Sequence, residues 1–164
     1  MKKILCALIC VIFLCGCEGA AAPKAVNRNI SYRAHIFYYG KEYDCFAVID
    51  GDGRAEYKIN DGLLEGFTAT YFGDSITLSY AEKENPQPYS YPKGNMLSVL
   101  YELNESLGGE CKTEKKDGQY AVLSETTLGE YTLFISGAGL PLSAKLDDEE
   151  FYVEFYDVSL INQG

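Results

Sequence analysis

YDCFAVIDGDGRAEYKI, residues 43–59, is the stretch of sequence that decides the fold. Its apolar residues recur at every second position: Tyr43, Cys45, Ala47 and Ile49 on the first arm, and Ala55, Tyr57 and Ile59 on the second. A period of two places these side chains on one face of a strand. The acidic, glycine-containing segment 50–53 between the arms is typical of a hairpin turn. The sequence therefore predicts a β-hairpin with one buried and one wet face.

The acidic turn also permits a calcium interpretation, because an EF-hand loop begins with acidic ligands at alternate positions. Counted from Asp50, the third ligand position falls on Arg54 and the required glycine on Ala55, and no helical pattern flanks the segment. We therefore interpret it as a turn. No Cys and His spacing is typical of a metal site, and the lone His35 stands in a strand pattern, so we expect neither a metal nor a cofactor.

Alternation continues on both sides of this hairpin and predicts about nine strands. They are expected at 32–38, 43–49, 54–59, 67–72, 75–80, 119–124, 129–136, 142–146 and 151–161. The segment 85–92 contains Pro86, Pro88 and Pro92. Because proline lacks the donor that a central strand needs, we predict an extended connection or flap there.

The period changes at residues 95–107, where the apolar residues are Met96, Val99, Leu100, Leu103 and Leu107. This spacing is typical of one face of a helix, and Gly108 and Gly109 end the pattern. We expect the apolar face to be buried against a sheet. The predicted fold class is therefore mainly β, an antiparallel sheet packed on one main helix.

The start of the chain has the layout of an export signal, with Lys2 and Lys3 followed by eleven uncharged residues at 4–14. That run is too short to span a bilayer, which takes about 20 apolar residues. The segment 14–17, Leu-Cys-Gly-Cys, resembles the bacterial lipobox. This resemblance implies that residues 1–16 are a cleaved signal peptide and that Cys17 is acylated with palmitate-type chains.

The predicted organisation is then a signal peptide at 1–16, a lipidated Cys17 with a flexible linker at 17–29, and a single domain at 30–164. The linker interpretation rests on the small residues, proline and polar residues of that segment. We expect a protein of the cell envelope, with the membrane as its partner through the lipid on Cys17. The outer face of the cytoplasmic membrane is the expected site, and the outer membrane is the alternative.

Charge excludes one class of partner. The chain has 14 basic and 24 acidic residues and a formal net charge of −10, and removal of Lys2 and Lys3 with the signal makes it two units more negative. Nucleic-acid binding requires clustered Lys and Arg. The nearest cluster, Lys112, Lys115 and Lys116, is interrupted by Glu114, so we predict a solvated loop and no nucleic-acid partner.

Cysteine usage leaves two thiols in the domain. Of the six cysteines, three lie in the predicted signal and Cys17 is the predicted anchor, which leaves Cys45 and Cys111. Outside the cytoplasm they can pair. A disulfide between them and two separate free thiols both remain open.

The order of elements resembles the LolA/LppX-like superfamily of lipoprotein carriers and extracytoplasmic lipoproteins. The residues that carry the resemblance are the hairpin at 43–59, the segment 63–67 before the next strand, the helix at 95–107, and the closing segments 129–133, 139–145 and 152–155. The resemblance implies a strongly curved, unclosed half-barrel whose mouth is filled by helix. Unlike a soluble carrier, this chain carries a predicted anchor, so it is expected to bind locally.

Two functions follow from these patterns. The first is a binding module for a hydrophobic ligand such as a lipid, an acyl chain or a lipopeptide, held in the concave face of the sheet. Its predicted groove residues are Tyr57, Phe67, Tyr71, Leu78, Leu100, Tyr131 and Leu133. The alternative is a structural or protein-interaction lipoprotein that uses the flap with Tyr89 and Tyr91. We expect no enzyme, because one histidine assembles no catalytic triad and no phosphate-binding loop occurs.

Overall fold

The computed structural model describes residues 29–80, 83–90, 94–106, 113–116, 119–146 and 150–161. The predicted signal peptide, Cys17 and the linker up to residue 28 lie outside the described residues. Within the described part, the strands are β1 (Ile30–Tyr38), β2 (Lys41–Ile49), β3 (Ala55–Ile59), β4 (Phe67–Phe72), β5 (Ser75–Tyr80), β6 (Lys83–Ser90), β7 (Thr113–Lys116), β8 (Gln119–Thr126), β9 (Gly129–Ile135), β10 (Pro141–Leu146) and β11 (Phe151–Leu160). The helical elements are the short 3-10 helix η1 (Gly62–Leu64) and the α-helix α2 (Met96–Ser106).

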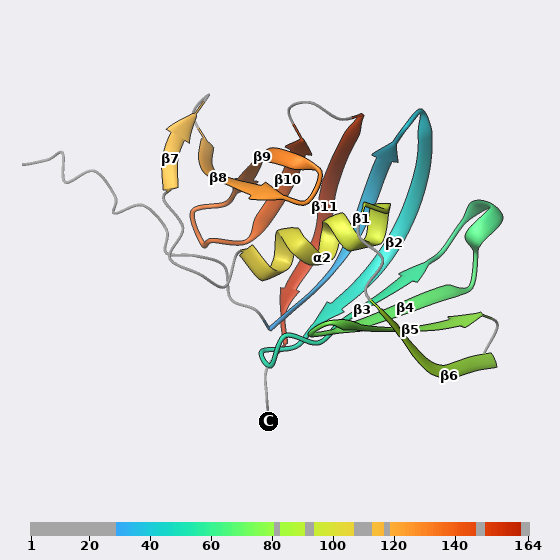
Figure 1. Cartoon of the computed structure of the whole chain (residues 1–164). Coiled ribbons are helices and arrows are strands. Elements are labelled where there is room, and N and C mark those ends of the chain that lie inside the picture. Colours follow the sequence, from blue (N-terminus) through green and yellow to red (C-terminus); the bar gives the residue numbers. More distant parts are fainter. Residues whose placement is uncertain are drawn as a thin grey trace, which may run out of the picture.

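The eleven strands form one antiparallel sheet in the order β6-β5-β4-β3-β2-β1-β11-β10-β9-β8-β7. The chain runs outward from β1 to the edge at β6, crosses back through α2 to the other edge at β7, and returns to pair β11 with β1. Figure 1 shows α2 lying across one face of the curved sheet. The predicted fold class, a mainly β protein with a curved antiparallel sheet on one helix, is confirmed.

The hairpin between β2 and β3 forms as predicted. Asp50 N donates to Arg54 O at 2.8 Å, and Gly53 N donates to Asp50 O at 3.0 Å. Gly53 has a φ of +91°, a left-handed conformation that favours glycine. The turn thereby sets a register in which Ala47 lies opposite Tyr57.

Large and small side chains alternate across the concave face of the sheet. Tyr32 lies opposite Ala47, Ala47 opposite Tyr57, and Tyr57 opposite Ala69, and all four are buried. The alanines leave room between the tyrosine rings, so a helix can approach the sheet closely. These four residues therefore form the surface of the sheet on which α2 packs.

The start of α2 is fixed by a side-chain cap. Asn95 Oδ1 accepts hydrogen bonds from the backbone N–H groups of Leu97 and Ser98, both at 3.0 Å, and Asn95 N donates to Ser98 Oγ at 3.0 Å. Asparagine is a strong N-cap because its side chain satisfies amides that have no partner within the helix. The predicted helix at 95–107 is thus confirmed as Met96–Ser106, and residue 107 lies outside the described residues.

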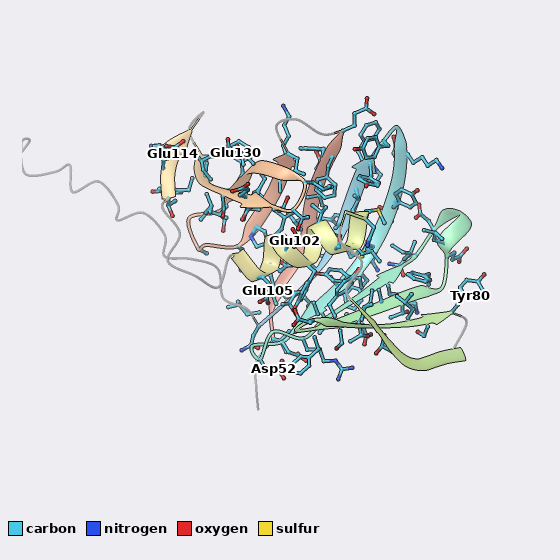
Figure 2. All side chains as sticks on the ribbon, in the orientation of Figure 1. Asp52, Tyr80, Glu102, Glu105, Glu114 and Glu130 are labelled. Carbon is cyan, nitrogen blue, oxygen red and sulfur yellow. The ribbon has the colours of Figure 1, made fainter. Side chains whose placement is uncertain are left out.

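The remaining faces of α2 tie the helix to the sheet and the β8–β9 turn. Glu102 and Glu105, labelled in Figure 2, lie on its partly buried side. The Glu102 carboxylate accepts hydrogen bonds from Thr127 N at 2.6 Å and from Thr127 Oγ1 at 2.8 Å. Among the described residues, no helix is long and apolar enough to cross a membrane.

The structure has two strands more than the predicted nine, and both lie at the edges of the sheet. The proline-rich segment forms β6, which pairs with β5 at one edge, where proline is tolerated. The predicted solvated loop around Lys115 and Lys116 was wrong, because these residues belong to β7 and pair with Tyr120 and Gln119 of β8. Proline on one edge and lysine on the other discourage further strands from adding to the open sheet.

A buried amide joins α2 to the middle of the sheet. Asn104 Nδ2 donates to Tyr32 OH at 3.0 Å and to Tyr57 OH at 2.8 Å, and it also reaches Leu100 O at 2.8 Å. Burial raises the pKa of both phenols far above the usual range, so they remain protonated. Tyr101 OH adds a bond to Gly53 O at 3.3 Å.

We predict that Asn104→Leu destabilises the protein by about 1–3 kcal/mol, because it removes the amide from two buried phenol oxygens. Leucine keeps the size of the position and has a higher helix propensity than asparagine, so a loss of stability reports the polar contact. Urea unfolding followed by circular dichroism measures the change. In a Tyr32→Phe, Tyr57→Phe background the same substitution should cost clearly less, and an equal cost in both backgrounds would contradict the anchoring role.

Candidate functional site

The structure places all seven predicted groove residues on the side of the sheet that carries α2 or within α2 itself. Five of them are 0–1% exposed and belong to the core, namely Tyr57, Tyr71, Leu100, Tyr131 and Leu133. The other two, Phe67 and Leu78, are half-buried against that core. The concave face is therefore packed by the helix over most of its area.

Ring contacts fill the space between sheet and helix. Tyr71 packs edge-on against Tyr57, with ring centroids 5.8 Å apart. On its other side Tyr71 stacks on Tyr101 of α2 at 5.0 Å and an interplanar angle of 21°. Burial raises the pKa of Tyr71 to about 12, so the ring stack stays neutral at any physiological pH.

An apolar cavity remains at the N-terminal end of α2, and we call it the mouth cavity. Its volume is about 230 Å³. The residues that line it come from β1, β2, η1, β4 and the start of α2: Tyr38, Tyr43, Leu64, Phe67, Asn95, Met96 and Leu97. Phe67 is the one predicted groove residue among them, and Leu64, at 40% exposure, lies at the rim.

The walls of the mouth cavity are held by local contacts. Tyr38 OH donates to Gly94 O at 3.1 Å, and the Tyr38 ring packs edge-on against Phe151 at 6.1 Å. The side chain of Asn95 is engaged as the helix cap, where it occupies the amides of Leu97 and Ser98. These capped amides cannot serve an anionic head group, so the cavity favours an uncharged apolar occupant.

Sequence reasoning missed most of this lining. Tyr38 and Tyr43 were recognised only as inward strand positions, and Met96 only as part of the helix face. Leu64 was recognised only as part of the segment before the next strand, and a single exposed leucine is common on protein surfaces, so it gave no signal of its own.

Cys45 is a buried thiol in β2. Burial raises its pKa to about 12, which keeps the sulfur protonated and unreactive. Cys111 lies outside the described residues, so a disulfide with Cys45 and two separate free thiols both remain open.

The predicted contact flap is only partly within the described chain. Tyr89 lies in β6 opposite Ile76 of β5, and Tyr91 lies outside the described residues. The segment is therefore an edge strand up to Ser90.

His35 lies on the outer face of the sheet, away from α2, and faces acidic partners. Its Nδ1 is 3.0 Å from Asp44 Oδ1, and its Nε2 is 3.7 Å from Glu42 Oε2. No group of three metal-ligating side chains occurs among the residues that the structure describes. The hydrogen bond to Asp44 is the main cause that raises the pKa of His35 above its ordinary value.

Because the folded pKa is raised, protonation of His35 stabilises the fold fully below the unfolded value of about 6.5, and this stabilisation is lost as the pH rises through the folded pKa. We therefore predict that the wild-type protein loses stability relative to His35→Gln between pH 6 and pH 8. Proton NMR reports the titration directly, since the chain has one histidine. Asp44→Asn should lower the pKa of His35. A pKa of His35 at or below 6.5 that does not change on this substitution would contradict the pairing of His35 with Asp44.

No family model matches the chain, and no curated protein matches it. Among solved structures, the chain is similar to a LolA superfamily protein from Nitrosomonas europaea, with 9% identity, a TM-score of 0.42, and coverage of 88% of this chain and 89% of that chain. It is also similar to a DUF1329 family protein from Desulfovibrio piger, with 11% identity, a TM-score of 0.43, and coverage of 84% and 88%. Both likenesses concern the fold alone.

Proposed function

We propose that this protein is a non-enzymatic binding module of the cell envelope, anchored by a lipid on Cys17, which receives the end of an apolar chain in its mouth cavity. The candidate ligands are a lipid, an acyl chain or a lipopeptide. The observation that carries the proposal is the mouth cavity itself, an apolar opening at the N-terminal end of α2.

The packing of the concave face supports the mouth cavity over a groove along the sheet. Movement of α2 away from the sheet would break the Asn104 bonds to Tyr32 and Tyr57 and the Tyr71–Tyr101 stack. At about 230 Å³, the cavity is smaller than the ~300–1,000 Å³ of typical small-molecule sites. It therefore suits one end of an extended chain whose remainder stays outside.

The chemistry of the lining supports binding over catalysis. The titratable side chains in the mouth cavity are the phenols of Tyr38 and Tyr43. His35 lies on the opposite face of the sheet, paired with Asp44. A general acid or base must be within hydrogen-bond reach of the reacting group, and among the residues that the structure describes no carboxylate or imidazole lines this cavity.

The anchor proposal rests on the lipobox-like segment 14–17 and on the predicted linker at 17–29. Fully extended, such a linker reaches about 40 Å. Two acyl chains are required for durable attachment, because one chain binds a bilayer only marginally. The proposed setting is thus an acidic domain held near, but not against, a membrane.

We predict that Leu64→Trp blocks ligand binding, because an indole at the rim would fill the cavity mouth. The chain from Glu18 onward, secreted without the lipidation signal and purified without detergent, should bind a dansyl-labelled fatty acid with a rise in fluorescence. Leu64→Trp should weaken the affinity for the fatty acid at least roughly tenfold, since a blocked cavity removes most of the apolar contact between ligand and protein.

Phe72→Ala, on the opposite face of the sheet, is the matched control and should bind as the wild type does. Absence of fatty-acid binding by the wild type, or equal binding by Leu64→Trp, would rule out the mouth cavity as the site.

A separate prediction concerns the anchor. Full-length protein extracted from membranes should have the intact mass of a chain that begins at Cys17 and carries a diacylglyceryl group. Cys17→Ala should abolish both the modification and the labelling by radioactive palmitate. An unmodified mature N-terminus would refute lipid anchoring while leaving the ligand proposal untouched.

A further inference from the structure

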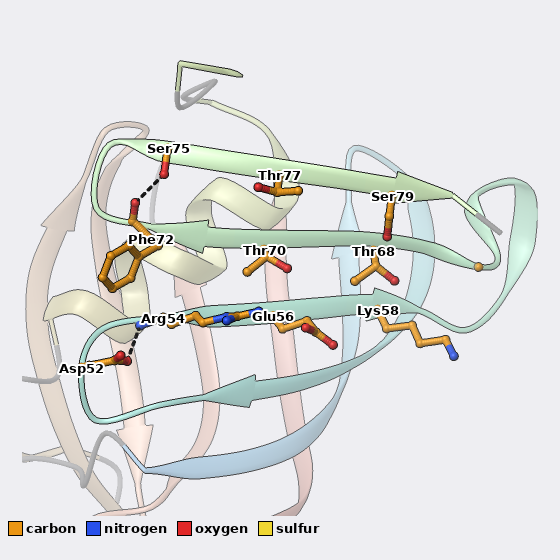
Figure 3. A pocket seen from close by; sticks show the side chains of 11 residues that line it. Asp52, Arg54, Glu56, Lys58, Thr68, Thr70, Phe72, Ser75, Thr77 and Ser79 are labelled. Atoms are coloured by element: carbon orange, nitrogen blue, oxygen red, sulfur yellow. Dashed lines mark hydrogen bonds between the residues drawn. The ribbon is translucent and has the colours of Figure 1, made fainter. Parts of the chain in front are cut away.

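A wide groove lies on the outer face of the sheet, opposite α2, over β3, β4 and β5. We call it the outer groove, and its volume is about 850 Å³. Figure 3 shows its charged floor on β3, its hydroxyl groups on β4 and β5, and Phe72 at one end. Phe72 is 55% exposed. An outer sheet face this rich in hydroxyls differs from the acidic remainder of the domain.

Four hydroxyl groups of the outer groove have no hydrogen-bond partner among the described residues. Thr68 lies opposite Ser79, and Thr70 opposite Thr77. None of these four hydroxyls forms a side-chain hydrogen bond to any described residue, whereas the nearby Ser75 donates to Phe72 O at 2.9 Å. The four can therefore donate and accept hydrogen bonds with a ligand.

The charges of the groove are balanced. Asp52, Arg54, Glu56 and Lys58 alternate in sign along one side, and among the described residues these side chains form no ion pair. The whole chain, by contrast, has a formal net charge of −10. A neutral patch on an acidic protein favours an uncharged ligand over an anionic or a cationic polymer.

Register extends the groove into a longer track. One row of directly opposed outward side chains crosses six strands from β11 to β5: Tyr156, Arg33, Phe46, Lys58, Thr68 and Ser79. With about 4.8 Å between neighbouring strands, the row is roughly 24 Å long. Phe46 and Tyr156 are 39% and 38% exposed, so both present ring surface along it.

We propose that this outer face binds an extended, uncharged polysaccharide chain that lies across the strands. A sugar polymer offers two kinds of contact, apolar ring faces and hydroxyl groups. Exposed aromatic rings provide stacking surfaces for the ring faces, and threonine, serine and charged side chains bond the hydroxyls. The row supplies both along its length.

Other occupants fit less well. The stable core of a protein interface is apolar and depleted in charge, whereas this track places charged side chains between its aromatic rings. An acyl chain would leave the Thr68, Thr70 and Thr77 hydroxyls unsatisfied. Nucleic acid needs an excess of positive charge, which the alternating signs on β3 do not provide.

The test uses the full-length protein in phosphatidylcholine nanodiscs, with empty nanodiscs as the blank, and measures its retention on insoluble chitin and cellulose. We expect retention on at least one of them, and the comparison distinguishes an amide-bearing sugar from a plain one. Phe46→Ala with Tyr156→Ala should weaken retention roughly tenfold, because two stacking surfaces are lost. Thr70→Val with Thr77→Val, which keeps shape and strand propensity, should weaken it several-fold.

Tyr80→Ala is the matched control, because Tyr80 is an exposed aromatic of β5 that follows Ser79 and so points to the other face. It should bind as the wild type does, and thermal unfolding confirms that every variant is folded. Leu64→Trp should also keep full retention, so a failure of the mouth cavity and a failure of this proposal are distinguishable. No retention of the wild type, retention on an anionic resin alone, or equal retention of all variants would overturn the proposal.

Discussion

The pairing of β1 with β11 is the constraint on which the rest of the structure depends. It joins the first and last strands of the described domain at the centre of the sheet, with Ala34 opposite Phe155 and Ile36 opposite Val153. Each half of the chain must then run outward to an edge of its own, and the segment between the halves has to cross the whole sheet. The helix α2 lies in that segment. The strand order therefore requires a crossing over the sheet, and packing then fixes where the helix lies.

The helix α2 completes the core and limits the space that remains for a ligand on the concave face. Its Asn104 bonds to the floor of tyrosines and alanines, and its Asn95 cap fixes where the first turn begins. Between these two points the concave face is filled. Apolar space survives where the helix begins and the short η1 turn leaves Leu64 at the rim, which is why the candidate site is a small mouth and not a groove.

The sequence was sufficient where the physical cause is local. Period-two alternation at 43–59 with its acidic glycine turn predicted β2, β3 and their connection, and the period change at residue 95 predicted α2. The edge strands β6 and β7 were missed because prolines and lysines signal a loop locally, whereas at an edge they are tolerated and protective. The mouth cavity could not be predicted, since Tyr38, Leu64 and Met96 come from segments that only the folded sheet brings together. The aromatic and hydroxyl row of the outer face depends in the same way on register across six strands.

The predicted linker and the mouth cavity lie at opposite ends of β1. Asn29 O accepts a hydrogen bond from Ile161 N at 2.9 Å beside the start of β1, where the predicted linker joins the domain, whereas Tyr38 at the far end of the strand lines the mouth cavity. From Ile30 to Tyr38 the strand advances by eight residue-to-residue steps, which corresponds to a distance of roughly 27 Å. The mouth cavity therefore lies at the end of β1 that is remote from the point where the predicted linker joins the domain, so the two features occupy opposite ends of the same strand.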